Sequence, residues 1–451
     1  MVHWIVAQTA DFKRRFVRCV LSAVCEESVR RALAGFRERD RVWNGWAMVR
    51  TFLAQVMAGE TCRAAVERAI QQGWVPPSTS PANSSYCTAR SALPEDALAA
   101  LATATGEALA GQARPSDQPL ERPVRVVDGT GLRLPDTAAN QKTYPQPASQ
   151  KPGCGFPIMY VCALMDLASG AILSALTCGG AGHERTLFRG LWGALQKGDI
   201  LLADAGFGSY AEIAVLLRRG VDSVVRLGCR KARAGRLKEL GPDDWLVEWT
   251  RPQKPGDWTQ PEALPATLRM RVIAFTVRQP GFRTKHVVLA TTLLDEELHP
   301  KRQLMALYRR RWEMELHLRD IKTTMGLEEL RCKSPEGCRK ELWMGLLAYN
   351  LIRTVMLDAA RHRRVQVARI SFAGTLQRLS AFAAGPMAHA DPAAAYRLLL
   401  DHLGRDLVPH RPNRTEPRAV KRRPKNYQRL NRPRHLFHEC PHRNRYRKAL
   451  I

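Results

Sequence analysis

The chain has 451 residues and a mass of 50.6 kDa, more than one hydrophobic core needs, so we expect about two to four domains. Its 70 Lys and Arg against 42 Asp and Glu give a formal net charge of +28, while 45% hydrophobic residues are ordinary for a folded protein. This charge indicates a polyanionic partner, most often nucleic acid, and argues against an enzyme of acidic small molecules or a structural repeat protein.

Other classes are excluded by what the sequence lacks. No stretch approaches 18 uninterrupted apolar residues, so we expect no membrane contact. The first residues lack a cationic leader with a long apolar core, and we expect a cytoplasmic, nucleoid-associated protein. The 11 cysteines are scattered without a CxxC pair, which is typical of a reduced protein. No GxxxxGK[ST] loop is present, so a P-loop ATPase is not supported.

The N-terminal residues 1–114 are predicted to be helical. Two apolar runs at helical spacing, 46–57 and 62–70, are separated by a Gly-containing turn, with Thr61 as a plausible N-cap. This compact pair is either a DNA-binding helix-turn-helix or a purely structural hairpin. The Pro-rich joint 115–123 is the predicted boundary of this domain.

After this joint, apolar strands alternate with helices, which indicates an α/β core with a central sheet. One short strand is predicted to end at Asp128 and another at Asp204, and each acid is followed by a small residue. Because a charge inside a sheet is costly, we expect both carboxylates at strand ends facing a crevice. Two converging carboxylates suit Mg²⁺, although acids at strand ends also serve as caps and turn formers.

The C-terminal half holds a β-rich segment and then helices. Within a predicted helix, Tyr308, Arg311, Glu315 and Lys322 follow at steps of three, four and seven residues, which places them on one stripe. Such a row suits a helix that holds one metal ligand beside DNA phosphates. The alternative is a solvated helix on which Arg311 merely pairs with Glu315 at i,i+4.

The pattern Tyr-x2-Arg-x3-Glu-x6-Lys formed by these residues matches the signature of DDE transposases of the insertion-sequence-four type. The segments 128–140 and 198–207 resemble the first- and second-aspartate segments of that family. Residues 85–90 and the basic stretch 420–425 also resemble family landmarks, so the likeness covers most of the chain.

The resemblance implies roles for individual residues. It assigns Asp128, Asp204 and Glu315 as the catalytic triad and as the ligands of Mg²⁺, with Mn²⁺ able to serve the same carboxylates. It further implies DNA contacts by Tyr308, Arg311, Arg319 and Lys322 on the helix, with Arg319 as a weaker neighbour, and by Lys421, Arg422 and Arg423 in the basic C-terminal stretch.

The implied fold is α/β, a ribonuclease-H-like core with a mixed sheet, a β-rich insertion and a helical N-terminal domain. The expected domains are a helical DNA-binding domain (1–114), a catalytic core in two parts (115–228 and 299–365, the second with the Glu315 helix), a β-rich insertion (229–298) and a C-terminal helical and basic region for DNA binding or dimerisation (366–451).

The implied function is that of an insertion-sequence transposase. Such an enzyme binds the terminal inverted repeats of its element, and cleaves and transfers DNA strands by two-metal-ion phosphodiester chemistry. The family implies cut-and-paste movement through a hairpin at the element's end, by a homodimer that pairs two ends. Two alternatives stay open: a catalytically silent repressor that binds the ends, and a general metal-dependent nuclease. Three placed acids argue against the repressor, since a pure binder has no need of them.

Hairpin formation requires distorted DNA, and a stacked aromatic side chain can hold a flipped base. Trp245, Trp249 and Trp258 lie where the family places such a residue, so we expect one of them to stack on a base. The alternative is that each packs the insertion's own small core.

Two further patterns are weak. A group near the C-terminus suggests zinc but matches no standard finger spacing, and consists of His435, His438, Cys440 and His442. The pair His183-Glu184 lacks the second histidine of HExxH and is better explained as the start of a helix.

Overall fold

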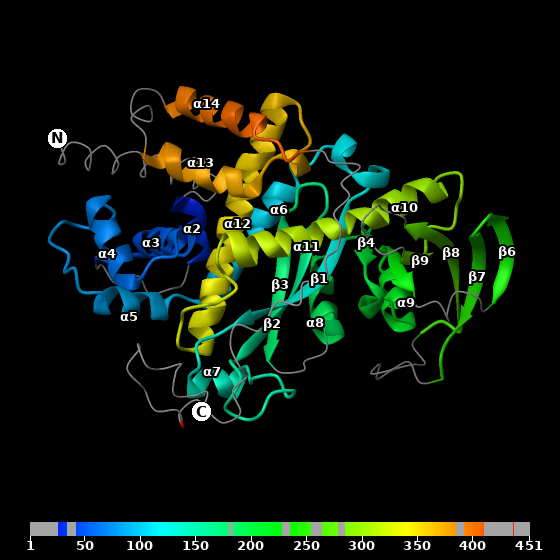
Figure 1. The fold of residues 1–451 in the computed structure, drawn as a ribbon, viewed down its shortest axis with the longest axis horizontal. Coiled ribbons are helices and arrows are strands. Elements are labelled where there is room, and N and C mark those ends of the chain that lie inside the picture. Colours follow the sequence, from blue (N-terminus) through cyan, green and yellow to red (C-terminus); the bar gives the residue numbers. More distant parts are fainter. Residues whose placement is uncertain are drawn as a thin grey trace, which may run out of the picture.

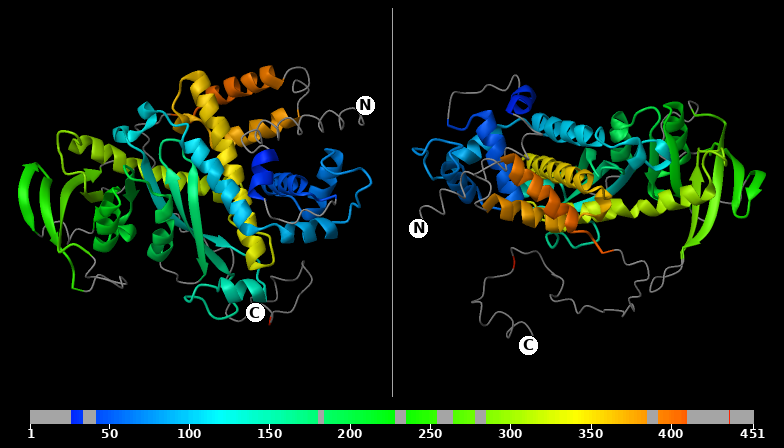
Figure 2. Two further views of the ribbon diagram at one scale, coloured as in Figure 1. Left: turned by 180° about the vertical axis from the view of Figure 1, so that it is seen from behind. Right: turned by 90° about the horizontal axis from the view of Figure 1, so that it is seen from above.

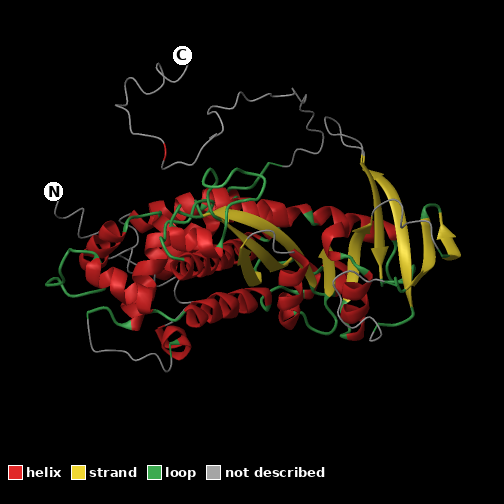
Figure 3. Ribbon diagram, turned by 90° about the horizontal axis from the view of Figure 1, so that it is seen from below, coloured by secondary structure: helices red, strands yellow, loops and turns green. Residues whose placement is uncertain are grey.

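The computed structural model describes residues 26–33, 42–179, 184–227, 235–253, 264–277, 285–384, 392–409 and 436. A nine-stranded sheet carries helices on both faces, with a helical assembly at one end and the last strands of the sheet at the other (Figures 1 and 3). The strands are β1 (Val124–Arg133), β2 (Ile158–Asp166), β3 (Ile172–Gly179), β4 (Ile200–Ala203), β5 (Asp222–Leu227), β6 (Arg236–Gly241), β7 (Asp244–Thr250), β8 (Thr267–Val277) and β9 (Lys285–Thr291).

The sheet has the order β3-β2-β1-β4-β5-β9-β8-β7-β6. Its first three strands pair antiparallel, whereas β4 runs parallel to β1 and β5 runs parallel to β4. This 3-2-1-4-5 arrangement, with helices on both faces, is the ribonuclease-H-like arrangement that the sequence resemblance implies. The predicted fold class is therefore confirmed.

Alternation along the strands divides the core into two layers, because successive side chains of a strand point to opposite faces. Val124 and Val126 pack in one cluster with residues of α6 (Glu95–Ala110), α11 (Trp312–Arg319) and α12 (Pro335–Arg363). On the other face, Val127 packs with α8 (Glu184–Gly190) and α9 (Tyr210–Arg218). The two faces of β1 are thus both covered.

The remaining helices are α2 (Glu26–Ala32), α3 (Gly45–Ala58), α4 (Cys62–Gln71), α5 (Ser84–Ala92), α7 (Ala138–Thr143), α10 (Lys301–Arg310), α13 (Phe372–Ala384) and α14 (Pro392–Arg405). Of these, α3, α13 and α14 pack against α12, which lies between the helical end and the sheet (Figure 2), whereas α10 leads into α11. The predicted pair α3 and α4 is confirmed, and the Thr61 side chain accepts a hydrogen bond from the Ala64 N–H as its N-cap.

Short helical turns complete the connections. They are η1 (Pro115–Asp117), η2 (Pro119–Glu121), η3 (Leu191–Ala194), η4 (Ala205–Phe207), η8 (Val367–Arg369) and the π-helical turn η7 (Asp320–Thr324). None of the helices within the described ranges combines the length and the apolar character that crossing a membrane requires.

One expectation about the strands is corrected. Asp128 was expected at the end of its strand, but β1 continues through it to Arg133, because these residues pair with β2. The β-rich segment joins the central sheet, because β9 pairs with β5, and Trp245 packs in the same cluster as α9. Pairing with β9 supplies partners for the backbone groups that an edge strand β5 would expose.

Candidate active site

Asp128 and Asp204 lie side by side on neighbouring parallel strands. The register of β1 and β4 pairs Val126 with Leu202. Two residues beyond that pair come Asp128, within β1, and Asp204, directly after β4. Because neighbouring strands are about 4.8 Å apart, the register brings these two carboxylate-bearing positions together. Each carboxylate accepts a hydrogen bond from the backbone N–H of the next residue, at 2.8 Å and 2.7 Å respectively.

Glu315 reaches the same place from α11, which packs across β1 (Figure 1). The connection runs through the guanidinium of Arg311. Its Nη2 donates to Glu315 Oε1 at 2.8 Å, and its Nη1 lies 3.7 Å from Asp128 Oδ2. The i,i+4 pair read from the sequence therefore forms, and the same arginine also joins the helix carboxylate to a strand carboxylate.

The other residues of the helical stripe lie around this cluster. Tyr308 is buried at the end of α10, and the Arg311 guanidinium lies 6.0 Å from its ring centroid. Lys322 lies half-buried in the π-helical turn η7, a feature often found at functional sites. Arg319 is exposed and pairs with Asp320 at 3.5 Å. The structure thus brings Tyr308, Arg311 and Glu315 together and leaves Arg319 at the rim.

The charged groups of the site shift one another's pKa values. Burial raises the pKa of Asp128, and the charges of Glu315 and Glu184 add to that effect against the opposing Gly129 N–H and Arg311. Burial also raises the pKa of Tyr308, with a further contribution from the negative charge of Asp204. The pKa of Arg311 is raised despite burial, because it donates to Glu315 and lies in the fields of Tyr308 and Asp204.

The donor set suits a hard divalent cation, since all three acids offer carboxylate oxygens. Among the residues that the structure describes, no three His, Cys, Asp or Glu side chains are gathered closely enough to hold an ion. The Arg311 guanidinium bridges two of the three acids, Asp128 and Glu315.

Two charged neighbours were missed from the sequence. Arg226 on β5 lies 3.9 Å from Asp204 Oδ1. Glu184, the first residue of α8, approaches from the opposite face, and its Oε1 lies 2.9 Å from where a Cβ on Gly129 would be. Glu184 does start a helix, as expected, but its nearness to Asp128 depends on Gly129, the next residue of β1, which has no side chain to exclude the carboxylate. No local spacing in the sequence predicts this contact.

The tryptophan candidates differ in exposure. Trp245 is only 6% exposed and the Arg236 guanidinium lies 4.2 Å from its ring centroid, so a base could not reach the ring without displacing that arginine. Trp249 is half-buried. Trp258 lies outside the described residues, as do Lys421, Arg422 and Arg423 and the histidine and cysteine group at 435–442.

The sheet thus carries two aspartates on neighbouring parallel strands, and a helix packed across one of these strands carries a glutamate that shares an arginine with the first aspartate. Residues 119–351, just over half of the chain, match the transposase DDE domain family, and the chain belongs to that family of DNA-cleaving and strand-transferring enzymes.

A curated relative of known sequence is also a transposase. The chain is 29% identical over 313 residues to the transposase InsG for insertion sequence element IS4 of Escherichia coli K12, an alignment that covers 67% of this chain and 68% of that protein. A likeness to the piggyBac transposase synaptic complex with hairpin DNA has a TM-score of 0.41 at 10% identity and covers 89% and 86% of the two chains. That score is too low for any conclusion about this chain.

Proposed function

We propose that this insertion-sequence transposase binds the terminal inverted repeats of its own element and moves it by cut-and-paste, with Asp128, Asp204 and Glu315 as its catalytic, metal-binding triad. The proposal is supported by the register of β1 and β4, which aligns the two aspartates, and by the packing of α11 on β1, where Arg311 connects Glu315 to Asp128. Mg²⁺ is the proposed ion, and Mn²⁺ would serve the same oxygen ligands.

The chain's own residues have distinct parts in this reaction. Divalent ions held by the three carboxylates would supply an activated attacking oxygen and stabilise the leaving oxygen. Arg311 is positioned to exchange its carboxylate partners for a DNA phosphate beside the scissile bond, which would free Asp128 and Glu315 as ligands. Tyr308 and Lys322, with Arg319 at the rim, would contact the transposon end on the same side of the helix.

The other parts of the chain are proposed to hold the DNA. Residues 1–114 would recognise the element's end, and 366–451, with Lys421, Arg422 and Arg423, would contact DNA or a second subunit. The core would consist of 115–228 and 299–365, with the β-rich segment 229–298 between them. A homodimer that pairs two ends, associated with the nucleoid, is the expected assembly. The net charge of +28 supports the DNA contacts.

The proposal is tested with labelled duplexes that carry either the element's own end or the same bases scrambled, incubated with Mg²⁺. A transposase is expected to cut only the first, at the element boundary. Equal cutting of both duplexes would favour a general nuclease. Binding of the true end without cutting would favour the repressor.

Replacing Arg311 by Ala is expected to have opposite effects on metal and on DNA. Without the guanidinium, Asp128 and Glu315 lose their shared cation, so the DNA-free protein should bind Mn²⁺ about tenfold more tightly, measured by isothermal titration calorimetry. DNA cleavage should fall, because a phosphate contact is lost. The matched control is Arg309→Ala, since Arg309 is exposed on the preceding turn. Unchanged or weaker Mn²⁺ binding by the Arg311 variant would contradict this account.

Trp249 is the proposed base-stacking residue, because it is the candidate that lies half-buried among the described residues. Trp249→Ala is expected to reduce hairpin formation about tenfold or more, since base stacking on an aromatic contributes about 1–3 kcal/mol, and to leave first-strand nicking unchanged. Gel separation of nicked and hairpin products measures the two steps. Trp245→Ala should instead lower the stability of the fold. Normal hairpin yield by the Trp249 variant would exclude the role.

A further inference from the structure

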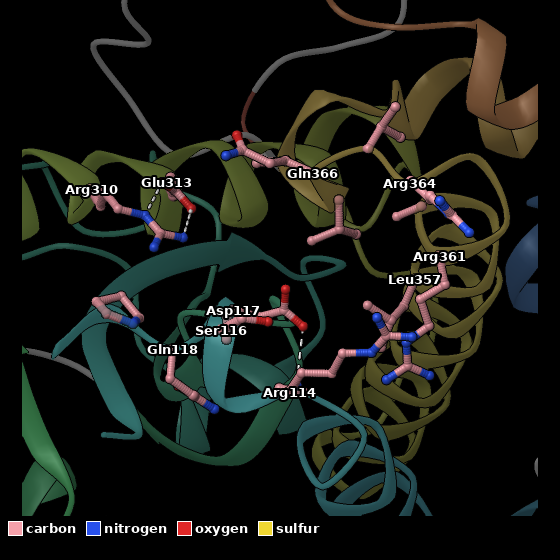
Figure 4. A pocket seen from close by; sticks show the side chains of 17 residues that line it. Arg114, Ser116, Asp117, Gln118, Arg310, Glu313, Leu357, Arg361, Arg364 and Gln366 are labelled. Atoms are coloured by element: carbon pink, nitrogen blue, oxygen red, sulfur yellow. Dashed lines mark hydrogen bonds and ion pairs between the residues drawn. The ribbon is translucent and has the colours of Figure 1, made fainter. Parts of the chain in front are cut away.

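A second basic site lies beside α11, the helix that carries Glu315. A cavity of about 1120 Å³ opens between the linker turn η1, α11, the C-terminal end of α12 and η8 (Figure 4). We call it the arginine cavity, because four arginines from three segments line it: Arg114, Arg310, Arg361 and Arg364. Nothing in the catalytic scheme uses it.

The positive charge of the arginine cavity is not balanced. Arg310 pairs with Glu313 at 2.7 Å. The acid beside Arg114, Asp117, accepts from the Arg114 backbone N–H and not from its guanidinium. Among the described residues, neither Arg114 nor Arg364 has a carboxylate partner.

Arg361 also lacks a carboxylate partner within the part of the chain that the structure describes. There its guanidinium donates only to the neutral oxygens of Gln112, and its buried Nε has no hydrogen-bond partner. Figure 4 shows Arg114, Arg361 and Arg364 gathered at one side of the cavity, with Arg310 and Glu313 at the other. Three guanidiniums without a carboxylate repel one another, and an anion placed between them would relieve that repulsion.

The cavity and the triad share one helix. Arg310 lines the cavity, and the next residue, Arg311, contacts Asp128. Ala168, at the cavity wall, follows Leu167, whose N–H donates to the Val124 carbonyl at the start of β1. Val124 is four residues before Asp128, which is about 13 Å at the rise of a strand. That distance equals about four base-pair steps of 3.4 Å in duplex DNA.

We propose that the arginine cavity binds the phosphodiester backbone of the DNA whose scissile phosphate lies at the triad, about four nucleotides from the cleaved bond. Arg114 and Arg364 donate to the phosphate, and Arg361 supplies its unpaired Nε. This inference rests on the proposed function. It adds a sequence-independent anchor, which fixes the direction in which the DNA leaves the active site.

The test is a scan with neutral phosphates. Duplexes that carry the element's end, each with one methylphosphonate, are titrated with wild type and with the double variant Arg114→Ala/Arg364→Ala, in Ca²⁺ to prevent cutting. One substitution three to five nucleotides from the cleaved bond is expected to weaken wild-type binding about tenfold. The double variant should bind unmodified DNA more weakly by about tenfold or more, and the methylphosphonate at that position should not weaken its binding further. The slope of log affinity against log salt concentration should be smaller in magnitude by about two.

Controls separate the site from general charge and from folding. Arg218→Ala/Arg219→Ala removes the same charge from exposed positions at the end of α9, on the other face of the sheet, and should leave the scan unchanged. Arg114→Lys/Arg364→Lys should restore part of the affinity. The proposal would be overturned if the alanine double variant bound DNA with wild-type affinity. It would also be overturned if every methylphosphonate weakened DNA binding by the double variant as much as it weakens binding by the wild type. Because a backbone contact is sequence-independent, the loss should also appear on scrambled duplex. Failure of the proposed function would instead appear as equal wild-type affinity for both duplexes.

Discussion

Glu315→Gln is expected to lower the rate of DNA cleavage by about 10³-fold or more and to leave DNA binding unchanged. Charge stabilisation by a metal ion is worth several kcal/mol in such reactions, and each 1.36 kcal/mol is a factor of ten in rate. Glutamine keeps the shape of the side chain but removes the charge that would hold the ion. The remaining amide oxygen still accepts from Arg311, which is 2.8 Å from Glu315 Oε1 in the wild type.

The measurement is single-turnover cleavage of an end-labelled duplex with Mg²⁺, alongside binding in Ca²⁺. Glu313→Gln is the matched control, because Glu313 is two residues earlier on α11 and pairs with Arg310 at 2.7 Å, away from the aspartates. Its cleavage rate should stay within a few fold of wild type. If the Glu315 variant cleaves as fast as this control, Glu315 is not a ligand.

Asp244→Ala is expected to cost about 3–5 kcal/mol of the free energy of unfolding. Arg271 is only 1% exposed, and all three of its guanidinium nitrogens have partners. Nε and Nη2 donate to Asp244 Oδ1 and Oδ2 at 2.8 Å and 2.5 Å, and Nη1 donates to the His299 carbonyl at 2.7 Å. Removing the carboxylate leaves a buried cation without its counterion, which is costly. The pair also fixes the loop that leads into α10, and hence the helix that carries Tyr308.

Urea unfolding followed by circular dichroism measures this cost. The control is Glu248→Ala on the same strand, where Glu248 and Arg269 form an exposed pair 4.0 Å apart between the same two strands. That change should cost less than about 1 kcal/mol, as exposed ion pairs do. Equal losses in the two variants would show that burial of the Arg271 pair contributes nothing.

Much of the fold could be predicted from the sequence, because its elements follow local patterns. The apolar run that ends at Asp204 is β4, and Thr61 caps α4 as its position before a helical run indicates. The predicted end of β1 was wrong for a physical reason. Gly129 and Gly131 weaken strand propensity, so the pattern favours an end at Asp128, but pairing with β2 carries the strand through both.

Only some of the contacts that define the candidate site could be predicted from the sequence. The spacing of Arg311 and Glu315 predicts their pair, because one turn of helix brings them together. The contact of the same guanidinium with Asp128, and the nearness of Arg226 to Asp204, depend on how α11 and β5 pack in three dimensions. Likewise, the pairing of β9 with β5 joins segments that are distant in the sequence, and no local pattern predicts it.

The central claim is that Asp128, Asp204 and Glu315 hold the catalytic ions together once Arg311 has moved to DNA. The most direct test is a structure of the wild type with its element's end and Mn²⁺, in which anomalous scattering locates the ions. We predict ions within coordination distance of all three carboxylates, with the Arg311 guanidinium on a DNA phosphate. Mn²⁺ bound elsewhere, or Arg311 still joining Asp128 to Glu315 in the DNA complex, would contradict the account.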